Sequence, residues 1–344
     1  MKQVYQNIIK FTVALVLLAN LSHAQDFQLT QFYASPLLLN PGFAGATGQN
    51  RATLHNRVQW TGLAKPYRAH VASFDHSMPQ QRSGIGVMVA SEVNGTSRFR
   101  TQTANVVYSH RIDVNSSWSI RPGLQFGVGN RRIDYSQLVF GDQIYERGLT
   151  GTQEDFSNMN SRYFFDVASG VVVHNSQVWI GFSAHHLNRP DVTFVRSGEA
   201  LPIRMSVHGG AKINLDNNRI RSSYKSRPDN VLIPSFNYKQ QGNFRQLDLG
   251  MYWNYEPIIV GAWYRGIPVF SSEEGYPFRD AVAILVGTKF NGFYFGYSYD
   301  FTVSRMEVYN SGGAHELSIS YVFPERRKKK PKKRRDMIIP CPDF

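Results

Sequence analysis

The chain has 344 residues, 42% of them hydrophobic, and its single cysteine, Cys341, excludes an intramolecular disulfide framework. It contains no run of about 18 consecutive apolar residues, which excludes a bundle of membrane-spanning helices. The formal net charge is +13, but Pro324–Phe344 carries +6 of it, so the basic character does not indicate that the body of the chain binds nucleic acid.

Residues 1–24 are typical of a secretory signal peptide. Lys2 and Lys10 precede an apolar run from Phe11 to Leu21, and small residues follow at Ser22-His23-Ala24. We expect cleavage after Ala24 and export of the mature chain.

Residues 25–50 are predicted to form a turn-rich segment before the first strand, because Asn40-Pro41-Gly42 and Gly45 favour turns. Two interpretations of its apolar residues stay open: they pack structurally, which we favour, or they enter the base of the fold as a plug or docking segment. These residues are Phe32, Tyr33, Leu37–Leu39 and Phe43.

Between residues 51 and 323, apolar and polar residues alternate in about fourteen segments, the pattern of half-buried strands. Arg51, His55 and Arg57, for example, oppose Leu54 and Val58. Charged residues recur on the polar faces, and buried charge is costly unless paired, so a watery or plugged lumen fits better than a dry core. The predicted strands are 51–60, 66–76, 83–91, 98–113, 117–133, 162–174, 177–188, 203–215, 231–240, 244–255, 257–265, 280–290, 293–304 and 314–323.

The segment Phe293–Val303 places Phe and Tyr on one face and mostly small or polar residues on the other. Such aromatic residues suit a membrane interface, and an even number of strands is typical of a bacterial outer-membrane barrel. We therefore predict an all-β protein, an antiparallel transmembrane β-barrel of about 14 strands over residues 51–323. A soluble β-sandwich is the alternative.

The predicted connections alternate between tight turns and long loops, as expected for such a barrel. Tight turns are predicted at His174–Gln177, Glu256–Pro257 and Asn291–Gly292. Asp134–Ser161 is among the long loops. The segment Asp216–Asn230 is an exception, because it is long but falls on the side of the short turns.

The sequence predicts no catalytic, cofactor-binding or metal-binding residues. His185-His186 has the composition of a metal site, but neighbouring residues of a strand face opposite sides. Acidic residues in the long loop, Asp142, Glu146, Glu154 and Asp155, lack the spacing of a calcium loop, so a solvated loop is the favoured interpretation.

Residues 324–344 form a basic tail, which export would place in the periplasm. We expect it to contact an acidic surface of a periplasmic or lipoprotein partner, with lipid headgroups or an inert tail as alternatives. The apolar end, with Cys341 and Phe344, is a candidate docking motif. The basic residues are Arg326, Arg327, Lys328, Lys329, Lys330, Lys332, Lys333, Arg334 and Arg335.

Several motifs resemble those of the PorP/SprF family of Bacteroidota type IX secretion and gliding proteins. They include Gln31-Phe32-Tyr33 and Gly296–Phe301, and together they extend over nearly the whole mature chain. The residues that carry the family pattern are Asn40, Pro41, Gly45, Gln59, Trp60, Tyr299, Asp300, Asn310, Ser311, Gly312, His315 and Glu316.

The resemblance implies a non-enzymatic outer-membrane component of the type IX secretion system. It would support secretion or surface attachment of a large cognate exported protein, received by the outer loops, and would contact the periplasmic machinery, outer-membrane lipid and no nucleic acid. A core role in the secretion machine is the alternative within the family. A diffusion porin is the alternative outside it.

Overall fold

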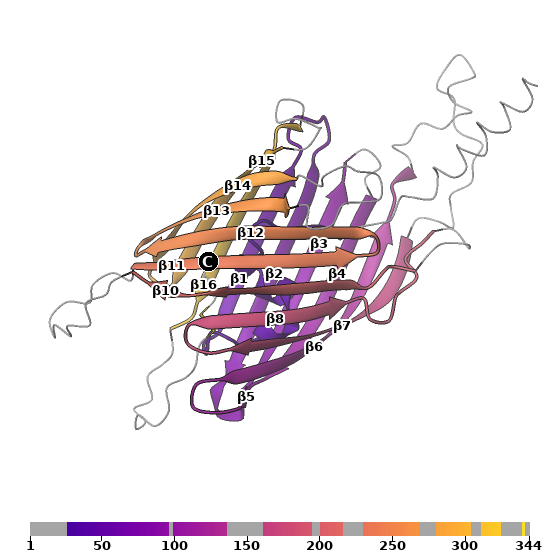
Figure 1. Cartoon of the computed structure of the whole chain (residues 1–344). Helices are drawn as coiled ribbons and strands as arrows, with labels where there is room; N and C mark the ends of the chain where they lie inside the picture. Colours follow the sequence, from indigo (N-terminus) through magenta and orange to yellow (C-terminus); the bar gives the residue numbers. More distant parts are fainter. Residues whose placement is uncertain are drawn as a thin grey trace, which may run out of the picture.

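The computed structural model describes residues 26–95, 99–135, 161–194, 200–215, 230–267, 280–303, 311–324 and 339–340. Within them, fourteen antiparallel strands close into a barrel (Figure 1). The ring closes because β1 pairs with β16 and β9 pairs with β11. Two short strands extend the ring: β5 continues β4 beyond Arg111, and β10 continues β9 beyond Lys212. The predicted barrel is thus confirmed.

The strands are β1 (Arg51–Gln59), β2 (Tyr67–Met78), β3 (Ser83–Asn94), β4 (Phe99–His110), β5 (Ile112–Asp113), β6 (Ser119–Arg132), β7 (Ser161–His174), β8 (Val178–His185), β9 (Arg204–Ala211), β10 (Ile213–Asn214), β11 (Asn230–Gln241), β12 (Phe244–Tyr255), β13 (Ile258–Ile267), β14 (Ala281–Phe290), β15 (Phe293–Thr302) and β16 (Ala314–Val322).

The alternation in the sequence corresponds to the two faces of the barrel wall. In β1, Arg51, His55 and Arg57 are buried inside, whereas Leu54 is 59% exposed outside. In β15, Phe293, Phe295, Tyr297 and Phe301 point outward, whereas Tyr294, Ser298 and Asp300 point inward. Among the described residues, no helix is long and apolar enough to cross a membrane.

The two rims of the barrel differ in their connections. At the short-turn end, β14 and β15 are joined by Asn291 and Gly292, whose φ angles of 48° and 84° are those of a type I′ hairpin turn. β10 ends and β11 begins at this end as well, and residues 216–229 between them fall outside the described part. At the opposite rim, the long-loop end, the strand ends flank residues 136–160 and 268–279, which also fall outside it.

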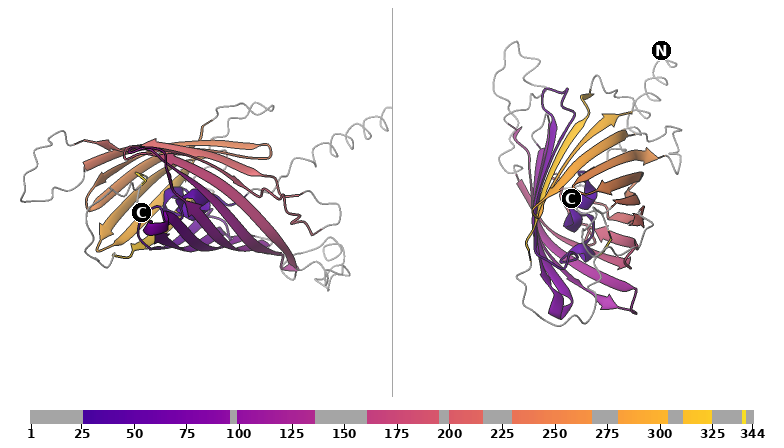
Figure 2. Two further views of the ribbon diagram at one scale, coloured as in Figure 1. Left: turned by 90° about the horizontal axis from the view of Figure 1, so that it is seen from below. Right: turned by 90° about the vertical axis from the view of Figure 1, so that its left-hand side faces the viewer.

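The N-terminal segment lies inside the barrel. Its helical turns are η1 (Phe32–Ala34), α2 (Pro36–Leu39) and η2 (Pro41–Phe43). Figure 2 shows these short indigo turns enclosed by the ring of strands. A further turn, η3 (Pro79–Gln81), connects β2 to β3. We call residues 26–46 the plug.

Candidate functional site: the plugged lumen

The plug runs through the lumen from one rim to the other. Asp26 forms an ion pair with Arg204 at the long-loop end. Gly45 lies against Gly84 near the short-turn end. Two cavities beside the plug have volumes of only about 60 and 70 Å³. The segment therefore fills most of the lumen between the two rims and is not confined to the base.

Glu316 of β16 binds the plug backbone. Its carboxylate accepts hydrogen bonds from the Thr30 and Gln31 amides at 2.9 and 2.6 Å. It also pairs with His55 at 2.8 Å and with Arg57 at 2.7 Å. Glu316 is 1% exposed, and a buried carboxylate is tolerated only with this many partners.

Asp300 of β15 forms a second charged contact beside the first. Its carboxylate pairs with Arg57 and Arg265, both at 2.8 Å, and accepts the Thr30 hydroxyl at 2.6 Å. Arg265 also pairs with Asp280. These groups form one buried network across four strands and the plug, in which opposite charges meet directly.

Asn40 stabilises the turn of the plug near the short-turn end. Its side-chain oxygen accepts the Gly42 amide at 2.8 Å, which caps η2. Its side-chain nitrogen donates to the backbone oxygens of Val171 and Phe182 at 3.2 and 3.0 Å. One side chain therefore both shapes the turn and fixes it to β7 and β8.

The barrel wall is adapted to this turn. Arg121 donates to the backbone oxygens of Gly42 and Ala44 at 3.1 and 2.7 Å. A Cβ atom at Gly84 would lie 2.2 Å from the Ala44 oxygen, and one at Gly170 would lie 2.2 Å from the Asn40 side-chain oxygen. Only glycine at these positions lets the plug approach so closely.

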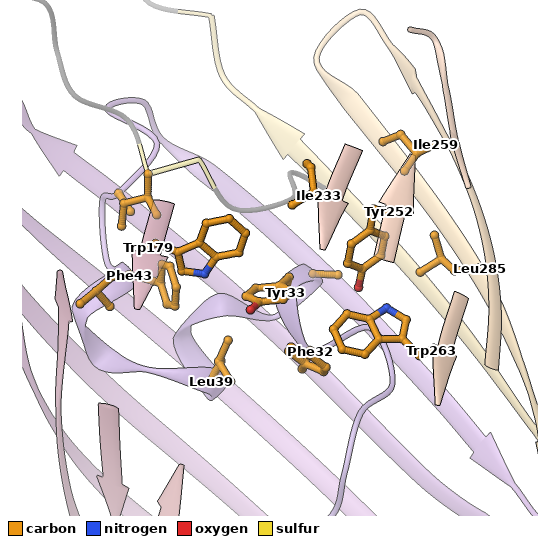
Figure 3. Packing of buried hydrophobic residues seen from close by; sticks show 14 of the residues in the cluster. Phe32, Tyr33, Leu39, Phe43, Trp179, Ile233, Tyr252, Ile259, Trp263 and Leu285 are labelled. Atoms are coloured by element: carbon orange, nitrogen blue, oxygen red, sulfur yellow. The ribbon is translucent and has the colours of Figure 1, made fainter. Parts of the chain in front are cut away.

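An apolar cluster surrounds the middle of the plug (Figure 3). Phe32 contacts Trp263 edge-on at a ring-centroid distance of 4.8 Å, and Tyr33 contacts Trp179 at 5.7 Å. Ile339, near the end of the chain, belongs to the same cluster and is 3% exposed. The lumen thus holds an apolar core as well as paired charge.

At the long-loop end, Asp26 pairs with His186 at 2.7 Å, and His186 pairs with Asp166 at 2.8 Å. Burial alone would raise the pKa of Asp26, but His186 and Arg204 outweigh it and hold this pKa below its ordinary value. Burial likewise opposes protonation of His186, but Asp26 and Asp166 raise its pKa to about 9. The pair is therefore charged at neutral pH.

A hollow of about 540 Å³ lies beside the first residues of the plug and opens at the long-loop end. Trp60, Tyr67 and Phe99 give it an aromatic wall, and Glu92 and Arg131 add charge. The Tyr67 hydroxyl donates to Glu92 at 2.8 Å. We call this hollow the vestibule.

The structure brings most residues of the predicted family pattern into two groups. Asn40, Pro41 and Gly45 lie in the plug, close to the wall, whereas Asp300 and Glu316 hold the plug from the strands. The others gather near the long-loop end. The Gln59 side-chain oxygen accepts a hydrogen bond from Arg57, and the Trp60 amide donates to the Gly313 oxygen at 2.8 Å. Tyr299 contacts Gly312 and His315. Ser311 donates to Thr302 at 3.0 Å. Asn310 lies outside the described residues.

The predicted docking residues of the tail, Arg326–Lys330, Lys332–Arg335, Cys341 and Phe344, lie outside the described part of the chain. Three tail residues lie within it: Pro324 is exposed, Ile339 belongs to the apolar cluster in the lumen, and Pro340 is buried beside it in the sequence.

Sequence reasoning did not single out Arg57, Arg265 or Arg121 as binding residues, although the alternation predicted that Arg57 points inward. Their partners could not be named, because Thr30 and Glu316 are 286 residues apart.

The expectation that His185 and His186 face opposite sides was wrong. β8 ends at His185, and His186 follows with a φ of 59°, so the strand alternation does not extend to it. Both side chains are largely buried, with ring centroids 6.4 Å apart. In the described ranges, no three His, Cys, Asp or Glu side chains are grouped so that they could hold a metal ion.

A family profile described as "Type IX secretion system membrane protein PorP/SprF" matches residues 21–321. Among solved structures, the P. putida toluene transporter TodX matches at 10% identity and a TM-score of 0.48, covering 83% of this chain and 93% of its own. The KdgM porin matches at 9% identity and 0.35, covering 80% and 99%. A mutant of the Rh. blastica porin matches at 8% and 0.33, with the same coverage. No curated protein sequence matches.

Proposed function

This chain belongs to the PorP/SprF family of type IX secretion system membrane proteins, and on that premise we propose that it acts in the outer membrane by binding proteins, not by conducting solutes. One observation carries the proposal: the plug fills most of the lumen and is held there by the buried network of Glu316 and Asp300. Removing one partner of such a network leaves a buried charge, so opening the lumen is costly.

Conductance in planar bilayers tests this proposal directly. The full chain should carry little current, whereas a diffusion porin of similar strand number should carry a steady one. A variant that lacks the plug, residues 26–46, should pass more current and serves as the positive control. A large, steady conductance of the unmodified chain would favour the porin alternative.

We propose that the partner at the long-loop end is a large cognate exported protein, whose secretion or surface attachment the barrel supports in the manner of SprF. The vestibule supports this role, because its aromatic and charged walls offer a binding surface that the plug does not occupy. The outer loops, chiefly Asp134–Ser161, would extend that surface.

Deleting the gene should abolish surface display of one exported protein and leave other type IX substrates on the surface. Loss of every substrate would instead support a core role in the secretion machine, and normal display of all of them would refute both roles. Copurification of a large exported protein with the intact barrel is the biochemical counterpart of this test.

We further propose that the short-turn end faces the periplasm and that the basic tail binds an acidic surface of the secretion machinery there. Burial of Ile339 in the lumen supports a refinement, in which the apolar end anchors the tail to the barrel and the basic run contacts the partner. The family indicates a secretion component, and we propose that the chain has no catalytic activity.

Two variants separate the roles of the tail. Truncation after Pro324 should leave barrel assembly intact and remove binding to the periplasmic components. Ile339→Asp should loosen the anchor but keep the basic run, so partner binding should weaken without disappearing. Unchanged binding and secretion after the truncation would refute tail docking.

A further inference from the structure

The outer face of the barrel carries a row of arginines at the long-loop end. Arg68 of β2 is registered with Val93 of β3, Val93 with Arg100 of β4, and Arg100 with Arg132 of β6. The neighbours Ala69, Thr101 and Arg131 are buried inside the barrel, so the three arginines point outward, and all three are exposed. We call Arg68, Arg100 and Arg132 the arginine row.

The three positive charges of the arginine row lie close together on the outer surface. Arg100 and Arg132 lie directly opposite each other on neighbouring strands, where like charges repel. No ion pair within the described ranges involves any of the three. Adjacent strands are about 4.8 Å apart, so the whole row extends over roughly 15 Å. An anionic group bound there would relieve the repulsion.

A polar row lies one step closer to the middle of the barrel. It runs across successive strands through Asn56, His70, Ser91, Gln102 and Asn130. The Asn130 side-chain nitrogen is buried and has no hydrogen-bond partner among the described residues. This donor lies on the outer face of β6, where it is available to an acceptor oxygen of a lipid headgroup.

A hollow of about 650 Å³ lies on the outer surface next to the polar row. Small residues such as Ala72 and Ala104 form its floor, between the larger Leu54, Val128 and Tyr163. Leu54, Val128 and Tyr163 are 59%, 62% and 79% exposed, as expected of residues that contact lipid chains. The hollow is therefore an apolar groove that begins where the polar rows end.

Cationic, polar and apolar surfaces thus follow one another in the order found along a phosphorylated lipid. We propose that this face binds the phosphorylated headgroup of an outer-leaflet glycolipid of the lipid A type, with a phosphate on the arginine row and an acyl chain in the groove. Arginine suits this role because its planar guanidinium binds phosphate oxygens in pairs. The inference rests on the proposed outer-membrane location.

The test uses the purified full chain in phosphatidylcholine nanodiscs, with diphosphoryl lipid A as the probe and native mass spectrometry as the readout. Arg100→Gln combined with Arg132→Gln should lower the retained lipid A about tenfold, the effect of losing charge-assisted hydrogen bonds to phosphate. Arg245→Gln is the control, since Arg245 is an exposed arginine at the same end on the opposite part of the wall, where it borders the vestibule and not the outer groove. It should leave retention unchanged.

A second pair of variants tests the groove. Ala104→Trp should fill the hollow and lower retention, whereas Ala262→Trp, at an exposed position of β13, should not. All variants change outward side chains, and heat-modifiable gel migration verifies that each barrel is folded.

Equal retention of dephosphorylated lipid A, or of phosphatidylglycerol, would overturn the assignment, and so would equal losses in the two arginine variants. Because lipid binding is measured on purified protein, its failure would leave the secretion proposal intact. Likewise, normal secretion in the deletion strain would not affect the lipid result.

Discussion

The two halves of the plug are held in the lumen by different chemistry. Near the long-loop end, Thr30 and Gln31 bind Glu316 and Asp300, carboxylates that are themselves paired with arginines. Near the short-turn end, the turn at Asn40 is held by neutral hydrogen bonds from Asn40, by hydrogen bonds from Arg121 to backbone oxygens, and by close contact with glycines of the wall. The first half depends on carboxylates paired with arginines inside the barrel, whereas the second depends mainly on close fit between the turn and the wall. Charge in this lumen therefore serves to bind a segment of the chain.

The largest effect is expected from the electrostatic half. Glu316→Ala removes the acceptor of two plug amides and one of the two carboxylates that pair with the buried Arg57, at a cost of about 3–5 kcal/mol. Thermal unfolding followed by gel migration measures the loss. Glu256→Ala is the control, because Glu256 forms an exposed pair with Lys289 and should change stability by less than about 1 kcal/mol. Equal effects would show that the network does not hold the plug.

The shape-dependent half is tested by Gly84→Val. The added side chain would overlap the Ala44 backbone, so the turn must move or the wall must distort, at a cost of about 2–3 kcal/mol. We expect the turn to leave its site and the bilayer current to rise. Ile85→Val, at the next residue of β3 but facing outward, should change neither quantity. A current that stays low would mean that the electrostatic half closes the lumen alone.

A smaller effect is expected at Asn40, because neutral hydrogen bonds are individually weaker. Asn40→Ala removes the cap of η2 and leaves the Val171 and Phe182 oxygens without this donor, a loss of roughly 1–2 kcal/mol. Unfolding midpoints measure it. A loss as large as that of Glu316→Ala would contradict the distinction between the two halves.

The smallest effect concerns pH at the Asp26–His186 pair. The pKa of His186 is raised, so the stability it contributes is fully present below its ordinary pKa and is lost as pH rises through about 9. We expect brief current openings to become more frequent between about pH 6.5 and pH 9, the window that linkage defines. His186→Gln should show such openings at every pH in this range, without the pH dependence.

The strand pattern was predictable because it depends on local alternation. Arg51, His55 and Arg57 occupy alternate positions of one strand, so they lie on the same face and their inward direction follows from strand geometry. The plug contacts were not predictable, since they join Thr30 to a residue 286 positions away. The position of His186 was missed for a local reason: its left-handed backbone ends the alternation one residue earlier than the sequence indicates.

The contact between Thr30 and Glu316 also constrains how the molecule is assembled. Glu316 belongs to β16, the last strand, and that strand closes the ring by pairing with β1. Contacts between distant parts of a chain form late, because the long loop between them must first be ordered. The plug therefore reaches its full set of partners only when the last strand has joined the first. In a barrel that has not closed, Thr30 and Gln31 lack their partner Glu316. Their polar groups therefore stay accessible until closure is complete.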